Sequence, residues 1–273
     1  MTRLKMFINR NACFSEKPNF LSNELRLLDW SNYPGESLPS NFCGKNLVVL
    51  TMPRSQLKEL EGVQNFQNMT IMNLVGCEFL RKIPNVSRIP NLEELDLHGC
   101  KNLVEIHHSI GFHDKLVSLK LGRCYNLKSF PRSLKMRSLK FLCLLRCSKL
   151  KNFPEIECQM ECLEYINFGG TGIKELPSSI ENLVGVKTLD LSDCTKLKYL
   201  EIPCIGDLDG IIQPFFLNSK YLSFIDCSKV AKFLKTMEEY ETIYARCCIH
   251  RGIGNFIGGR ITPIAAFVEY KRF

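Results

Sequence analysis

The stretch LEELDLHGCKNLVEIHHSI, residues 92–110, contains the pattern that decides the fold. Its apolar residues stand at fixed spacings, at Leu92, Leu95, Leu97, Cys100, Leu103 and Ile106. Leu95 and Leu97 alternate with Glu94 and Asp96, as in a short strand whose successive side chains point to opposite faces. Three residues of strand cannot be stable alone. This strand must therefore pair with similar strands elsewhere in the chain.

The same frame begins again, with drift, seven more times at intervals of 22 to 24 residues. The eight starting residues are Leu25, Leu47, Met69, Leu92, Leu116, Leu139, Leu163 and Val186. A repeat of about 20–29 residues with this spacing is the signature of leucine-rich repeats. One repeat buries too little apolar surface to fold by itself, so the repeats must stack on one another. The sequence therefore predicts a repeat solenoid.

The expected architecture is an α/β solenoid of horseshoe type, with short parallel strands on the concave face. Several repeats end in an apolar residue followed by proline: Ile83-Pro84, Phe130-Pro131, Phe153-Pro154 and Leu176-Pro177. Because proline lacks a backbone N–H and interrupts helices, we expect a convex side of irregular or short 3-10 segments.

Five of the fourteen cysteines occupy one equivalent position of the frame: Cys77, Cys100, Cys124, Cys147 and Cys194. Equivalent positions form a column inside the stack, where cysteine behaves as a small apolar residue. We therefore expect reduced, buried thiols and an intracellular protein. The sequence has neither an apolar run of about 18 residues nor the apolar core of a secretory signal. We expect no membrane association and a location in the cytoplasm or the nucleus.

The frame weakens at both ends of the chain. Leu4 and Phe7 fit a worn first repeat in which Asn9 replaces the third apolar residue, and no capping element precedes them. We therefore expect the C-terminal part of a longer protein. The predicted solenoid covers residues 1–203, with about eight or nine repeats and an uncapped N-terminus. Residues 204–273 are predicted to be a small mixed extension that holds a partial repeat, a helix near 229–246 and strands. The partial repeat consists of Leu222, Ile225 and Cys227.

The motifs of common enzyme classes are absent from the sequence. It contains neither a phosphate-binding G-x-x-x-x-G-K-[ST] loop nor a G-x-S-x-G nucleophile elbow. The glycines of RGIGNFIGGR, residues 251–260, lack the spacing of a dinucleotide fingerprint, and His107, His108 and His113 lack zinc-ligand spacing. We therefore expect no catalytic residues, no cofactor and no metal.

The net charge of +8 is partly concentrated in one column of the repeats. This basic column consists of Arg81, Lys128, Lys151, Lys174 and Lys198. It is either a solvated flank or a docking site for an acidic partner. Nucleic acid is a poor candidate, because no aromatic residues interleave the column to stack on bases.

The predicted binding surface is the row of residues that alternate with the buried leucines on the concave face. Apolar and aromatic residues mixed with charges suit a protein interface. The candidate partner-binding residues are Ile71, Asn73, Glu94, Asp96, His98, Lys120, Phe141, Leu145, Tyr165, Asn167 and Asp190. The alternative is a scatter of ordinary surface apolar residues.

Whole phrases of the sequence carry a more specific resemblance. They are residues 20–42, 46–60, 90–111, 151–183 and 189–200, for example NLVVLTMPRSQLKEL and LDLSDCTKLKYL. These phrases resemble the repeat region of plant TIR-NB-LRR disease-resistance proteins, of the tobacco mosaic virus resistance protein N type. The resemblance covers about residues 1–227 and is weaker for 204–273.

The resemblance implies a non-enzymatic, effector-sensing and autoregulatory module of an intracellular immune receptor. The TIR and nucleotide-binding domains of that family are not in this sequence. The implied partners are a protein ligand, either a pathogen effector or a guarded host protein, and a nucleotide-binding domain. The alternatives are a stand-alone repeat adaptor or scaffold, and a truncated paralogue without independent function. An extracellular repeat receptor would require a signal peptide and paired capping cysteines.

Overall fold

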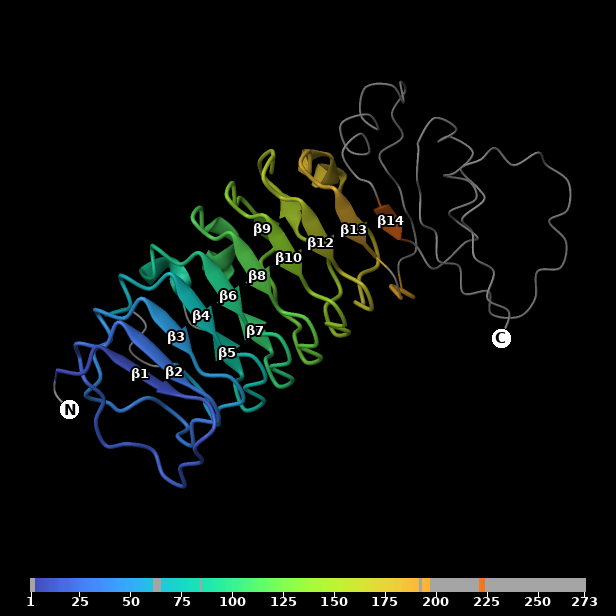
Figure 1. The fold of residues 1–273 in the computed structure, drawn as a ribbon. Helices are drawn as coiled ribbons and strands as arrows, with labels where there is room; N and C mark the ends of the chain where they lie inside the picture. The colour runs from blue at the N-terminus through green and yellow to red at the C-terminus, as the bar shows by residue number, and fades with distance from the viewer. Residues whose placement is uncertain (1–2, 61–64, 84, 192, 197–220, 224–273) are drawn as a thin grey trace, which may run out of the picture.

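The structure, a computed structural model, describes residues 3–60, 65–83, 85–191, 193–196 and 221–223. These residues form one ladder of ten parallel strands in the order β1-β2-β3-β4-β6-β8-β10-β12-β13-β14 (Figure 1). Their bounds are β1 Met6–Asn9, β2 Leu27–Trp30, β3 Val49–Thr51, β4 Ile71–Asn73, β6 Glu94–Asp96, β8 Ser118–Lys120, β10 Phe141–Cys143, β12 Tyr165–Asn167, β13 Thr188–Asp190 and β14 Tyr221–Ser223. The predicted parallel-strand solenoid is confirmed.

The repeat frame sets the register of every strand pair. The middle residue of each strand lies opposite the middle residue of the next, as in Leu95 opposite Leu119 and Leu119 opposite Leu142. All eight predicted starting residues are buried, with exposed fractions of 0 or 1%. Each repeat therefore places its leucines against those of the neighbouring repeats, and the core runs the whole length of the described solenoid.

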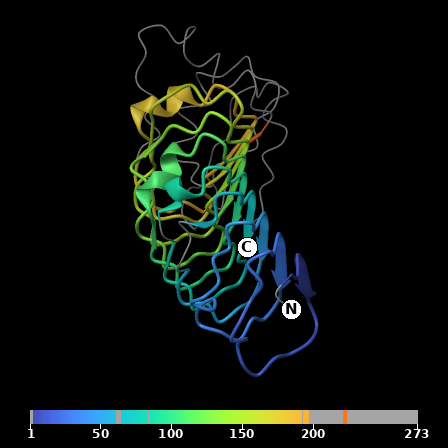
Figure 2. The same ribbon diagram turned by 90° about the vertical axis from the view of Figure 1, so that its left-hand side faces the viewer.

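The opposite side of the solenoid carries only short segments, as the prolines predict. Four two-residue strands form two small parallel pairs: β5 Lys82–Ile83 with β7 Glu105–Ile106, and β9 Ser133–Leu134 with β11 Glu155–Ile156. Among the described residues, this side also carries the 3-10 helices η2 Val86–Arg88, η3 His108–Phe112 and η4 Ser178–Asn182. Figure 2 shows η3 and η4 on the side of the solenoid away from the main sheet.

The predicted cysteine column is present, and each thiol has a hydrogen-bond partner. The five Sγ atoms donate to backbone carbonyls of the preceding repeat at 3.1–3.2 Å: Cys77 to Met52, Cys100 to Leu74, Cys124 to Leu97, Cys147 to Leu121 and Cys194 to Phe168. Burial raises the pKa of the Cys77 thiol to about 11. All five cysteines are free. In the repeat that begins at Leu163, Thr171 takes this position, also buried, and its Oγ1 lies 3.3 Å from Cys194 Sγ.

A second column, formed by the turns that follow the strands, was not predicted. One residue in each repeat adopts a positive φ of 56 to 75°, at Asn32, Arg54, Gly76, Gly99, Arg123, Arg146, Gly170 and Asp193. Glycine, asparagine and aspartate tolerate this left-handed conformation, whereas other side chains are strained in it. Three arginines therefore occupy positions that are unfavourable for them.

The worn first repeat continues the ladder. Phe7 lies opposite Leu28 and Asn9 opposite Trp30. Asn9 is buried and forms two hydrogen bonds with the backbone of Ala12, both of 3.0 Å, which replace the missing apolar contact. Several apolar side chains at this end are exposed, among them Met6 and Ile8 at 56% each.

The C-terminal predictions fall mostly on residues that the structure does not describe. β14 continues the sheet, with Leu222 opposite Leu189. Ile225, Cys227, the helix near 229–246, the predicted strands and Lys198 lie outside the described residues. Within the described part of the chain, no helix has the length and hydropathy needed to cross a bilayer.

Candidate protein-binding surface

The side of the main sheet that faces away from the core is called here the open face. It consists of two rows of side chains, one from the first and one from the third residue of each strand. The first row is Leu27, Val49, Ile71, Glu94, Ser118, Phe141, Tyr165 and Thr188. The second row is Asp29, Thr51, Asn73, Asp96, Lys120, Cys143, Asn167 and Asp190. The first row is apolar at β2–β4, polar at β6 and β8 and aromatic at β10 and β12.

The most distinctive feature of the open face is an aromatic pair. Phe141 of β10 lies opposite Tyr165 of β12, and their rings stack with centroids 4.5 Å apart and planes 4° from parallel. Lys120 Nζ lies 5.8 Å from the Phe141 ring centroid, within the range of a cation–π interaction. Both aromatic residues are half-buried. A stacked, partly exposed pair beside a cation is a rigid amphipathic platform, of the kind enriched at protein interfaces.

Three predicted contact residues also terminate their strands. The Oδ1 atoms of Asn73, Asp96 and Asn167 accept hydrogen bonds from backbone N–H groups two residues later, at 2.9–3.1 Å. The short side chains of Asn and Asp form this local bond readily. The recurrence of Asn or Asp at the third strand position was the sequence signal for this role.

Asn167 differs from the other candidates because it is only 5% exposed. Its Nδ2 donates to Tyr165 Oη at 3.0 Å and to Asp190 Oδ2 at 2.8 Å. Its amide is thus committed to internal bonds that hold Tyr165 and Asp190 in place. We assign Asn167 a supporting position behind the surface.

The other charged candidates are accessible. Glu94 is exposed, and Asp96 lies 3.8 Å from Lys120 through its Oδ2 atom, a loose surface ion pair. Ile71, Leu145 and His98 are half-buried. The structure therefore brings the predicted residues onto one continuous face, from β4 to β13, with Asn167 beneath it.

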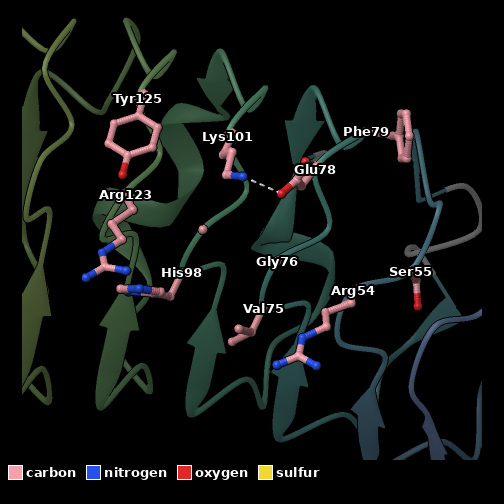
Figure 3. A pocket seen from close by; sticks show the side chains of 11 residues that line it. Arg54, Ser55, Val75, Gly76, Glu78, Phe79, His98, Lys101, Arg123 and Tyr125 are labelled. Carbon is pink, nitrogen blue, oxygen red and sulfur yellow. Dashed lines mark hydrogen bonds and ion pairs between the residues drawn. The ribbon is translucent and has the colours of Figure 1, made fainter.

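A hollow that the repeat pattern does not predict lies at the carboxyl ends of β3, β4, β6 and β8 (Figure 3). Only His98 among its lining residues was predicted to be a contact residue. Phe79 and Tyr125 lie on its wall, and both are exposed, by 53% and 37%. Among the described residues, no group of three or more His, Cys, Asp or Glu side chains is placed to hold a metal ion.

Comparison with known proteins places these features in a family. The family described as "Disease resistance protein RPS4B-like, leucine-rich repeats" matches residues 135–208. Disease resistance protein RPP2A of Arabidopsis thaliana is 40% identical over 186 residues, which cover 68% of this chain and 14% of that protein. TMV resistance protein N of Nicotiana glutinosa is 34% identical over 237 residues, which cover 77% of this chain and 20% of that protein. The chain is a leucine-rich-repeat region of the plant TIR-NB-LRR disease-resistance type.

The similarity concerns the repeat region and not whole proteins. The chain spans no more than about a fifth of the length of these two relatives. A third relative, Protein SUPPRESSOR OF npr1-1, CONSTITUTIVE 1 of Arabidopsis thaliana, is 45% identical over 247 residues, covering 74% of this chain and 17% of that protein. Leucine-rich-repeat regions are typically non-catalytic protein-interaction modules.

Proposed function

We propose that this solenoid is the ligand-sensing and autoregulatory module of a plant intracellular immune receptor. In this proposal its open face binds a protein ligand, either a pathogen effector or a guarded host protein. A nucleotide-binding domain of a receptor is a second partner, held inactive until the ligand binds. The disease-resistance relatives and the column of free buried cysteines support a cytoplasmic or nuclear module without enzymatic activity.

The Phe141–Tyr165 stack is the single observation that carries the proposed ligand site. Its two rings are parallel and fixed by neighbouring strands, and Asn167 holds the Tyr165 hydroxyl. A preorganised aromatic pair loses little conformational entropy when a partner covers it. Accessible charges at Glu94, Asp96 and Lys120 lie on β6 and β8 of the same sheet and can form the polar rim of an interface.

The test is proximity labelling in plant cells, with the full chain fused to a biotin ligase. The wild type is compared with the double variant Phe141→Ser/Tyr165→Ser and with Phe112→Ser, in the presence and absence of pathogen challenge. Phe112 is a matched control, because it is 47% exposed and lies on η3, on the side away from the main sheet. We expect a set of labelled proteins that the double variant loses and Phe112→Ser retains.

Each protein that meets this criterion is then purified and titrated against the full chain, wild type and variants. Loss of binding in the double variant at unchanged thermal stability supports the proposal. Identical labelled sets for all three chains would refute an open-face ligand site. Labelling that depends on the open face but never on challenge would favour the adaptor or scaffold alternative over effector sensing.

A further inference from the structure

The hollow at the carboxyl ends of β3, β4, β6 and β8 has a volume of about 440 Å³ and lies beside the open face, where these four consecutive strands turn. We call it the arginine groove, because Arg54 and Arg123 stand at its two ends, as Figure 3 shows. Arg54 follows β3 and Arg123 follows β8, and the turns after β4 and β6 lie between them. The aromatic pair of the proposed ligand site lies outside this groove, on β10 and β12.

Both arginines occupy the left-handed turn position, at φ 57° for Arg54 and 61° for Arg123. Glycine or asparagine would be less strained at both positions, and glycine or asparagine does occur at other members of the column. A residue that is retained in a strained conformation invites a functional explanation when an independent observation supports one.

The charge of the two guanidinium groups supplies that independent observation. Within the described part of the chain, neither side chain forms a hydrogen bond or an ion pair, and both residues are exposed. Lys101, by contrast, is neutralised by Glu78, with Nζ 2.6 Å from Oε1. The groove therefore presents two free cations at its ends and a neutral pair between them.

The floor between the arginines is formed by glycines. Gly76 and Gly99 have φ of 70° and 75°, and a Cβ on Gly76 would come within 3.3 Å of Arg54 Cγ. Figure 3 shows the exposed rings of Phe79 and Tyr125 toward the two ends of the groove, with Tyr125 beside Arg123. Because Gly76 and Gly99 carry no side chains and Val75 lies next to them, the middle of the groove has space for an apolar side chain.

We propose that the arginine groove binds an extended acidic segment of a protein partner, an inference that rests on the proposed protein-binding function. Two of its carboxylates pair with Arg54 and Arg123, and an apolar residue midway between them fills the space above Gly76 and Gly99. Arginine forms bidentate hydrogen bonds with carboxylates, so the contact has geometric specificity in addition to the attraction between opposite charges.

The spacing of the strands defines the spacing of the carboxylates. The two arginines are three strand steps apart, or about 14 Å at roughly 4.8 Å per step. An extended chain rises about 3.3 Å per residue, so four residues cover about 13 Å. Side chains at positions i, i+2 and i+4 of an extended chain share one face. The expected motif is acidic-x-apolar-x-acidic.

The test uses fluorescent peptides of neutral background that carry Asp-x-Leu-x-Asp, measured by fluorescence anisotropy with the full chain. Control peptides place the two Asp residues side by side or replace the Leu with Ser. The groove variant is Arg54→Asn/Arg123→Asn, which keeps a residue type found in the same column at Asn32. The matched control is Arg146→Asn, which alters the same turn position one repeat beyond Arg123 and outside the groove.

We expect the groove variant to weaken binding of the Asp-x-Leu-x-Asp peptide at least about tenfold, since charged hydrogen bonds are among the stronger contacts. We expect Arg146→Asn to change it little. Equal affinity for both Asp spacings, equal loss in Arg146→Asn, or equal binding of a polyphosphate or an RNA oligonucleotide would overturn the proposal. If the groove variant binds the Asp-x-Leu-x-Asp peptide as well as the wild type does, while Phe141→Ser/Tyr165→Ser still loses its labelled partners, the groove inference fails and the proposed function stands. If the groove variant loses peptide binding but no labelled protein depends on Phe141 and Tyr165, the groove inference stands and the proposed open-face ligand site fails.

Discussion

At the residue scale, the cysteine column shows how one position of the frame acquires two roles. Each cysteine of the column fills the core beside the leucines, and its thiol also donates a hydrogen bond to a backbone carbonyl of the preceding repeat. A free thiol is small, largely apolar and a weak donor, so it meets both requirements. Burial raises the pKa of the thiols of Cys77 and Cys100, and a hydrogen bond with Cys147 together with burial raises the pKa of the Cys124 thiol, which keeps all three protonated and unreactive.

This protection predicts which cysteines are alkylated first and how the free energy of unfolding changes at alkaline pH. At neutral pH we expect iodoacetamide to modify the exposed Cys13 and Cys162 well before the five cysteines of the column, as measured by peptide mass spectrometry. The folded pKa of Cys77, about 11, lies above its usual value of 9.0. Between these values only the unfolded chain loses the proton, so the free energy of unfolding falls as pH rises, by about 1.4 kcal/mol per pH unit for each such thiol. Rapid native labelling of Cys100 would contradict the buried column.

Asn167 provides a second prediction at this scale. Asn167→Ala removes the acceptor for Gly169 N–H, which is buried, and the donor to Asp190. An unsatisfied buried group costs about 1–3 kcal/mol, so we expect a loss of this size in urea unfolding. Asn73→Ala removes the same kind of bond to Val75 N–H at a half-buried site. The control should lose less, and an equal loss in both variants would argue against the supporting position of Asn167.

At the scale of the element, the strand and its following turn impose different demands. The strand requires a buried middle residue, and every three-residue strand of the main sheet from β3 to β13 has one. The turn requires a positive φ, which glycine meets without strain and arginine does not. The turn column is therefore the place where composition departs furthest from what stability alone would select.

This difference predicts the sign of two arginine substitutions. Arg146→Gly should stabilise the chain by about 0.5–1 kcal/mol, because Arg146 has φ of 59° and glycine relieves the strain. Arg137→Gly is the control, at an exposed turn position where φ is not positive, and it should destabilise the chain. Thermal unfolding of the purified variants measures both. The same sign in the two variants would show that turn strain does not govern the effect.

At the scale of the whole molecule, stability comes from stacking between neighbouring repeats. Each inner strand contacts a strand on both sides, whereas β1 contacts only β2 within the described sheet. Terminal strands of such arrays lose fewer contacts when they open, so they open more often. The apolar side chains exposed near β1, such as Met6 and Ile8, belong to this less supported end.

Hydrogen exchange of the purified full chain, followed repeat by repeat, measures this gradient. We expect strong protection from Leu47 to Leu191, with faster exchange in β1 and in the residues before Leu25. The slowest amides should lie in the central strands β6, β8 and β10, which have the most neighbours on both sides. Complete exchange everywhere within seconds would mean that this chain does not hold the fold by itself, and it would undermine every binding proposal made for it.

The sequence alone determined the solenoid, the register of its strands, the cysteine column and the short segments of the convex side. It could do so because the period of the apolar residues dictates which residues of successive repeats meet, and Leu92, Leu95 and Cys100 recur with little drift. The proposed open face followed from the same alternation.

Only the tertiary structure decided the burial of Asn167, the stacking of Phe141 on Tyr165 and the arginine groove. These features depend on side-chain direction between repeats and on the sign of φ in each turn, neither of which the apolar period constrains. Arg54 and Arg123 are 69 residues apart in the sequence. They mark the two ends of one groove because three repeats, each of nearly the same length, place their turns in a single column.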